Sequence, residues 1–128
     1  MRFVTDAEYL EAALAGAPRL GHREHVRLAW LVLRREGPEA GGDRIARMLR
    51  HLAEAHDERD RYHETLTRFW IRLVAHAIEV EPDIDDFDVF VERFRLLLDG
   101  ASIGRHWSPD ALASGRRAWV EPDVLALP

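Results

Sequence analysis

Hydrophobic residues recur every three or four positions along most of the chain, which is the spacing of helices with one buried face. This pattern predicts a first helix from Asp6 to Ala15 and a second from His22 to Glu36. Gly37 and Pro38 should end the second helix, because glycine and proline are poor continuations of a helix. A third helix is expected over Asp43 to His56, with its first residue as the N-cap.

The most strongly apolar segment, Tyr62 to Ile78, is the predicted fourth helix, and the others are expected to pack around it. Its hydrophobic residues share one broad face, namely Leu66, Trp70, Leu73, Val74, Ala77 and Ile78. A fifth helix, capped by Asp85 or Asp86, carries an apolar stripe that stops at Gly100. A serine, proline and aspartate in succession then predict a short helix over Pro109 to Ala113.

No alternating strand pattern accompanies these helices, so the sequence predicts an all-α fold. We expect a compact antiparallel bundle of five to six helices in a single domain, residues 1–128, with a short extended C-terminal tail. The proline-punctuated tail from Glu121 to Pro128 could dock on a partner or a second copy, or pack across its own bundle.

Composition narrows the classes of function. With 128 residues, 47% of them hydrophobic, the chain can bury one core. Cysteine is absent, so a metal site must use nitrogen and oxygen ligands. The net charge of -5 argues against nucleic acid as a partner. No apolar run approaches the roughly 20 residues that cross a membrane, and no secretion signal begins the chain, so we expect a cytoplasmic protein without a membrane partner.

Histidines are the candidate functional residues. His22 and His25 lie in the first turn of the second helix and face inward, and residues three apart can reach one metal ion or one substrate. His63 and Thr67 lie on the apolar face of the fourth helix, in its first turn. If neighbouring helices are antiparallel, the second and fourth start at the same end, and the loop after the fifth brings His106 there. The sequence therefore predicts a polar pocket at one end of the bundle.

Three interpretations of this pocket remain open. In the first, a divalent metal (Zn, Fe, Cu or Mn) is bound by His22, His25, His63 and His106. In the second, no metal is present and the acid, base and orienting groups are Tyr62, His63 and Glu64, with the substrate pocket completed by Thr67, His106 and Trp107. In the third, each histidine is a satisfied core or capping residue.

The leading hypothesis from sequence is a small metal-dependent enzyme that acts on a small metabolite, which can be anionic. A metal-free enzyme or ligand-binding protein is the alternative, and a helical protein-interaction module, with an oligomer possible, is the next.

Four motifs also resemble a family of small, uncharacterised bacterial helical proteins. They are His22-x-x-His25-x-Arg27-x-Ala29-Trp30-Leu31, Tyr62-His63-Glu64-Thr65-Leu66-Thr67 with Trp70, His106-x-Ser108, and the ending Trp119-Val120-Glu121-Pro122-Asp123 with Leu127-Pro128. The resemblance spans nearly the whole chain. It implies a helical domain with these motifs as its working parts, but it brings no established activity, cofactor or substrate.

Overall fold

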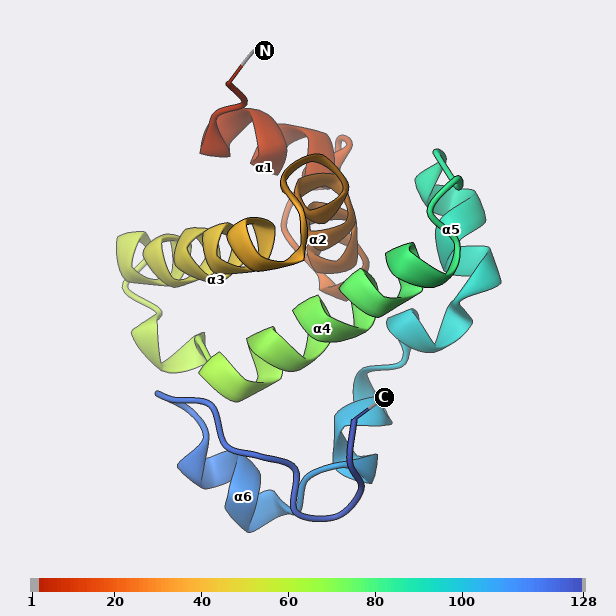
Figure 1. Cartoon of the computed structure of the whole chain (residues 1–128). Helices are drawn as coiled ribbons and strands as arrows, with labels where there is room; N and C mark the ends of the chain where they lie inside the picture. The colour runs from red at the N-terminus through yellow and green to blue at the C-terminus, as the bar shows by residue number, and fades with distance from the viewer. Residues whose placement is uncertain (1–2, 128) are drawn as a thin grey trace.

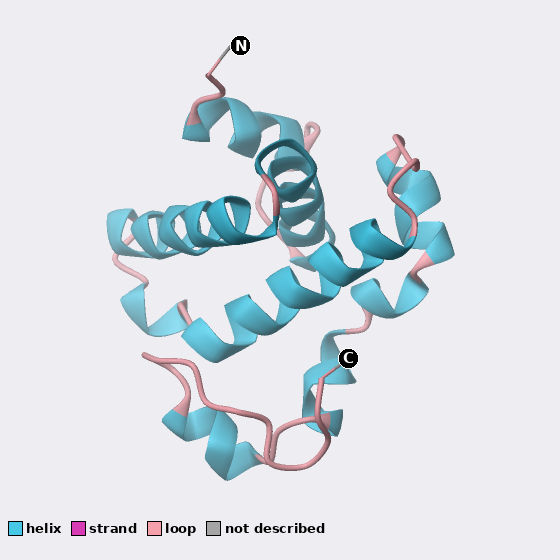
Figure 2. Cartoon of the chain, viewed as in Figure 1, coloured by secondary structure: helices cyan, strands magenta, loops and turns pink. Residues whose placement is uncertain are grey.

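The computed structural model describes residues 3–127, which are helical with irregular connections and contain no strand (Figure 2). The α-helices are α1 (Asp6–Leu14), α2 (His22–Glu36), α3 (Pro38–Ala55), α4 (Glu64–Val80), α5 (Phe87–Arg93) and α6 (Pro109–Ser114) (Figure 1). Short 3-10 helices are η1 (Arg59–Arg61), η2 (Arg95–Leu98) and η3 (Gly100–Arg105). The all-α prediction is thus confirmed for this part of the chain. Pro128, the end of the predicted tail, lies outside the described residues.

The helix α3 begins five residues earlier than predicted. Gly37, at φ +87°, turns the chain sharply, and Pro38 is the first residue of α3, where its missing N–H is no loss. Gly41 and Gly42 lie inside α3, where side chains would crowd the neighbouring helices. A Cβ on Gly41 would lie 3.3 Å from the Leu33 Cα of α2. Asp43 is therefore not the N-cap of this helix.

The one-residue connection also decides how α2 and α3 are oriented. In Figure 1, α2 is seen nearly end-on, while α3 and α4 lie across the view. The helices α2 and α3 therefore meet at a corner, which differs from the side-by-side antiparallel pair that we predicted. A single residue changes the chain direction but does not span the distance between two parallel helix axes, which is about 8–10 Å.

The first core lies among α1, α2, α3 and α4, with α5 and η2 closing one side. The helix α4 buries Val74 and Ala77 in this core, as its periodicity predicted, and begins at Glu64 rather than Tyr62. The predicted continuous fifth helix breaks at Phe94, whose backbone leaves the helical region. The break turns Leu97 into the core at 5% exposure, and leaves Leu98 38% exposed.

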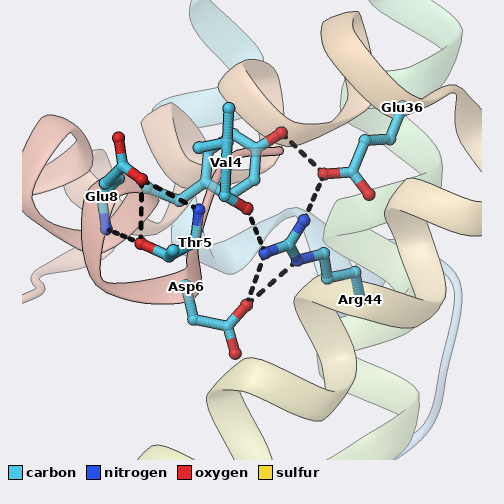
Figure 3. A network of polar contacts seen from close by, with 7 residues as sticks. Val4, Thr5, Asp6, Glu8, Glu36 and Arg44 are labelled. Carbon is cyan, nitrogen blue, oxygen red and sulfur yellow. Dashed lines mark hydrogen bonds and ion pairs between the residues drawn. The ribbon is translucent and has the colours of Figure 1, made fainter. Parts of the chain in front are cut away.

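An arginine network holds α1 against this core (Figure 3). Arg44 of α3 is 7% exposed, and its guanidinium donates to the Asp6 carboxylate at 2.9–3.0 Å, to Glu36 at 2.7 Å and to the Val4 carbonyl at 2.5 Å. The Tyr9 hydroxyl donates to the same Glu36 oxygen at 2.6 Å. Burial, reinforced by this carboxylate, raises the pKa of Tyr9 to about 12. Each of the three guanidinium nitrogens thus has a hydrogen-bond partner within the protein.

A second, smaller core joins the N-terminal half of α4 to the C-terminal third of the chain. Its buried members are Phe69, Ile103 and Trp107, and Trp119 and Leu127, near the C-terminus, pack against them. The Trp107 ring meets Phe69 edge-on, with centroids 5.3 Å apart. The C-terminal segment is therefore part of a core. Among the described helices, none has the length and apolar character to cross a membrane.

Candidate functional site

His63 occupies the N-cap of α4, one position before the first turn in which we placed it. Its Nδ1 accepts the Leu66 N–H at 3.1 Å, so this nitrogen carries no proton. Its Nε2 lies 2.8 Å from the Leu112 carbonyl oxygen, which can only accept, so this nitrogen is the donor. Both ring nitrogens are therefore engaged inside the protein, which leaves His63 no lone pair for the predicted metal or for a proton transfer.

Tyr62 and Glu64, the other predicted catalytic groups, belong to an ion-pair network at the same helix start. The Tyr62 hydroxyl donates to Glu64 at 2.6 Å, and the other Glu64 oxygen accepts from Arg68 at 3.1 Å. Arg68 continues to Asp43 of α3 at 2.9 Å. Burial first, and then the Glu64 carboxylate, raise the pKa of Tyr62 well above its usual range. The phenol stays protonated, and the network links α3 to α4.

Thr67 lies in the first turn of α4, as predicted, and is half-buried. Its backbone N–H donates to the His63 carbonyl at 2.9 Å. Its hydroxyl is near enough to Tyr62 to lower the pKa of the phenol slightly against the larger raising effects. Thr67 therefore joins the helix-start network.

His22 opens α2 and is half-buried against the middle of α4. Its ring meets Trp70 edge-on, with centroids 4.5 Å apart. Its Nε2 lies 2.8 Å from the Leu97 carbonyl oxygen and must be the donor. In the neutral ring, Nδ1 is then a free lone pair. A backbone carbonyl that fixes one imidazole nitrogen and leaves the other free is the usual way of orienting a histidine for function.

His25 lies one turn further along α2. The residue is exposed, yet the protein atoms around its ring displace enough water to lower its pKa. The nearby His22 lowers it further, and Glu24 raises it by a smaller amount. The ring is therefore neutral at pH 7, with an unprotonated nitrogen available.

His106 follows the last residue of η3, and its ring packs against the ring of Phe69, the residue before Trp70. Its centroid lies 5.5 Å from that of Phe69, and the Phe69 and Trp70 rings are themselves in edge contact at 5.0 Å. The Nδ1 of His106 lies 2.8 Å from the Leu125 carbonyl oxygen and donates to it. The Nε2 is then the free lone pair in the neutral ring. Trp107, predicted to line the pocket, is instead a core residue at 1% exposure.

The four predicted histidines therefore divide into two groups. His22, His63 and His106 each donate to a backbone carbonyl in the C-terminal third, at Leu97, Leu112 and Leu125 respectively. His63 lies at the start of α4 with both nitrogens engaged, whereas His22 and His106 contact adjacent residues two turns along the same helix. His25 stays beside His22. Instead of lining one pocket, His22 and His106 lie against Trp70 and Phe69 of α4, whereas His63 lies apart at the start of that helix.

The described residues offer no group of three or more His, Asp or Glu side chains arranged to hold a metal ion. Catalytic zinc sites usually have three protein ligands. The donor set around His22 and His25 therefore does not fit such a centre, and the metal site stays a prediction without support from this geometry.

Sequence reasoning missed one residue near these histidines. Ser102, four residues before His106, is 6% exposed, and its hydroxyl finds no hydrogen-bond partner within residues 3–127. Its chain neighbour Ile103 packs with Phe69 and Trp107 in the second core. A buried hydroxyl without a partner costs about 1–3 kcal/mol. Serine in a short irregular helix gives no signal of burial, which is why the sequence did not indicate it.

Thr65 is the second missed residue. It is completely buried, and its hydroxyl joins the helix start to the tail, since it donates to the Ala118 carbonyl and accepts the Val120 N–H, both at 3.1 Å. The predicted apolar face of α4 did not include Thr65, because its hydroxyl is polar and its hydrogen-bond partners lie 53 and 55 positions away in the sequence.

Comparisons with the models of known protein families, with curated proteins and with solved structures find no match to this chain.

Proposed function

We propose that this chain binds a small molecule at the Phe69–Trp70 stretch of α4 and performs acid–base chemistry on it without a resident metal. The observation that carries the proposal is the state of two imidazoles. His22 and His106 each have one nitrogen held by a backbone carbonyl and the other free, and both rings lie against this stretch. Imidazoles oriented in this way are ready to accept a proton from a ligand.

The groups around these rings favour a ligand with both a hydrogen-bond donor and an anionic part. Lone pairs on His22, His25 and His106 accept from a hydroxyl or amine, and the buried hydroxyl of Ser102 can donate. The N-terminus of α2, where His22 and His25 lie, attracts negative charge. A small hydroxy or amino acid has both features, so this is the class of ligand that we expect.

The predicted catalytic groups have other roles in this proposal. Tyr62, His63 and Glu64 fix the start of α4, and His63 also ties it to α6 through the Leu112 carbonyl. Their substitution should therefore lower stability before it affects ligand binding. This separates them from His22 and His106, whose free nitrogens contribute nothing to the hydrogen bonds of the fold.

The experiment is a thermal-shift screen of small hydroxy and amino acids on untagged protein, followed by titration calorimetry of any stabilising compound. His22→Asn and His106→Asn should abolish the stabilisation while each variant still folds. His51→Asn is the matched control, because His51 is an exposed histidine of α3. A ligand that binds equally well to wild type and to both site variants would refute the proposal.

Elemental analysis of the same untagged protein tests the metal-dependent alternative. Without a metal centre, the protein should contain less than one tenth of an equivalent of transition metal, and chelator should leave its melting temperature unchanged. One tightly bound metal per chain that disappears in His22→Asn would instead favour the metal-dependent alternative and overturn the metal-free mechanism.

A further inference from the structure

The C-terminal segment 118–127 is bound like a peptide ligand, although it belongs to the same chain. It contains no helix or strand. At the start of α4, the Thr65 hydroxyl bonds to the Ala118 carbonyl and to the Val120 N–H, and the Glu64 N–H donates to the Arg116 carbonyl at 2.8 Å. The backbone N–H groups at the start of α4 thus hold the residues just before the segment, and the Thr65 hydroxyl holds the main chain of the segment itself.

The opposite wall is the region from η3 to α6. The indole N–H of Trp107 donates to the Val120 carbonyl at 2.8 Å. The carboxylate of Asp123 accepts both the backbone N–H of Ser108, at 2.8 Å, and its hydroxyl, at 2.5 Å. These bonds lower the pKa of Asp123, so its charge persists. Trp119 adds an edge-on ring contact with Trp107, with centroids 5.5 Å apart.

The last residues of the segment are also held by hydrogen bonds to their main chain. The Val124 N–H donates to the His106 carbonyl at 2.9 Å, and the Leu125 carbonyl accepts from the His106 ring at 2.8 Å. Leu127 packs into the second core, whereas Val124 and Leu125 are 62% and 56% exposed. The segment therefore has main-chain bonds along its length and side-chain anchors at Trp119, Asp123 and Leu127, which is how extended peptides are recognised by grooves.

We propose that the groove between the start of α4 and the η3–α6 region is a peptide-binding site, filled in cis by this segment, and that it accepts the same segment from a second copy of the chain. Arg117, between α6 and the segment, is exposed and provides a place for the chain to swing out. The only occupant whose fit is visible is the segment itself, so a second copy is the partner that the groove matches. This inference does not depend on the proposed ligand site.

The groove binds the segment of a second copy only when its own segment binds more weakly. A short tether holds the segment near the groove at an effective concentration of about millimolar, so wild type should be monomeric at micromolar concentration. Two full-length variants remove this competition. The first has a defective segment, Trp119→Ala with Asp123→Ala, and an intact groove. The second has a defective groove, Thr65→Val with Ser108→Ala, and an intact segment.

Mixing the two variants is the decisive test. We expect each variant alone to be monomeric and the equimolar mixture to form a 1:1 heterodimer at about 100 μM, measured by analytical ultracentrifugation, after circular dichroism has shown that both are folded. A mixture that stays monomeric while both variants are folded would overturn the proposal.

A synthetic peptide of residues 115–128 keeps the test valid if the groove-defective variant does not fold. The peptide should bind the segment-defective protein at least about tenfold more tightly than wild-type protein, and more tightly than the same peptide with alanine at Trp119 and Asp123. Equal binding of the two peptides would show that the groove does not recognise the anchors and would also overturn the proposal. All variants keep His22 and His106, so failure here leaves the ligand proposal standing.

Discussion

Substitution of Thr65 by valine is the sharpest test of how the tail is attached. Valine has nearly the shape of threonine, so the change mainly replaces a hydroxyl by a methyl group at a fully buried position. Two hydrogen bonds of 3.1 Å are lost, one to the Ala118 carbonyl and one from the Val120 N–H. In the variant, the carbonyl of the exposed Ala118 can bond to water instead. The half-buried Val120 N–H is less accessible to water, so the loss of its bond costs more free energy.

The magnitude follows from these environments. Each lost bond costs about 0.5–1.5 kcal/mol, and the bond to the half-buried N–H should lie at the upper end of that range. The added buried methyl group returns up to about 0.8 kcal/mol. We therefore expect Thr65→Val to lower the free energy of unfolding by about 1–2 kcal/mol, which corresponds to roughly 3–8 °C in melting temperature for a chain of this size.

The assay is urea unfolding followed by tryptophan fluorescence, with hydrogen exchange at the Val120 amide as a local probe. Thr65→Ser is the matched control, because it keeps the hydroxyl and loses only the methyl group. Faster exchange at Val120 is expected in Thr65→Val and not in Thr65→Ser. If Thr65→Val matched wild type within about 0.5 kcal/mol, below the cost of even one average hydrogen bond, the hydroxyl would not hold the tail as described.

The remaining predictions concern Arg44 of α3, Gly115 after α6, and Asp123 of the C-terminal segment. Arg44→Met should cost about 2–4 kcal/mol in chemical unfolding, because it leaves two carboxylates unpaired, whereas the exposed Arg47→Met should change stability by less than about 0.5 kcal/mol. Gly115→Ala should lower the melting temperature, because its Cβ would lie 2.5 Å from the Thr65 oxygen, and an unchanged melting temperature would argue against this close approach. The stability advantage of wild type over Asp123→Asn should be full above the ordinary aspartate pKa and disappear as the pH falls through the lowered pKa of Asp123. A pH series of unfolding curves measures this, and a gap that persists in acid would contradict it.

The predicted helix starts illustrate what local chemistry can decide. The prediction at Ser108 is confirmed, because the Ser108 hydroxyl accepts the Ala111 N–H, and Asp86 caps α5 in the same way. The predicted start of α3 at Asp43 was wrong, because α3 begins at Pro38 and includes Gly41 and Gly42, which lie against the neighbouring helices. His63 was placed one residue too far into α4, because periodicity alone does not separate a cap from a first turn.

The sequence by itself determined the helical class, most helix bounds and the presence of histidines at two helix starts, because capping, turn chemistry and hydrophobic period act within a few residues. Only the tertiary structure decided which histidine nitrogens are free. That property depends on the carbonyls of Leu97, Leu112 and Leu125, which lie 75, 49 and 19 positions, respectively, from the histidine rings they hold. Their approach follows from the packing of η2, α6 and the C-terminal segment beside these rings, and such long-range arrangements leave no period in the sequence.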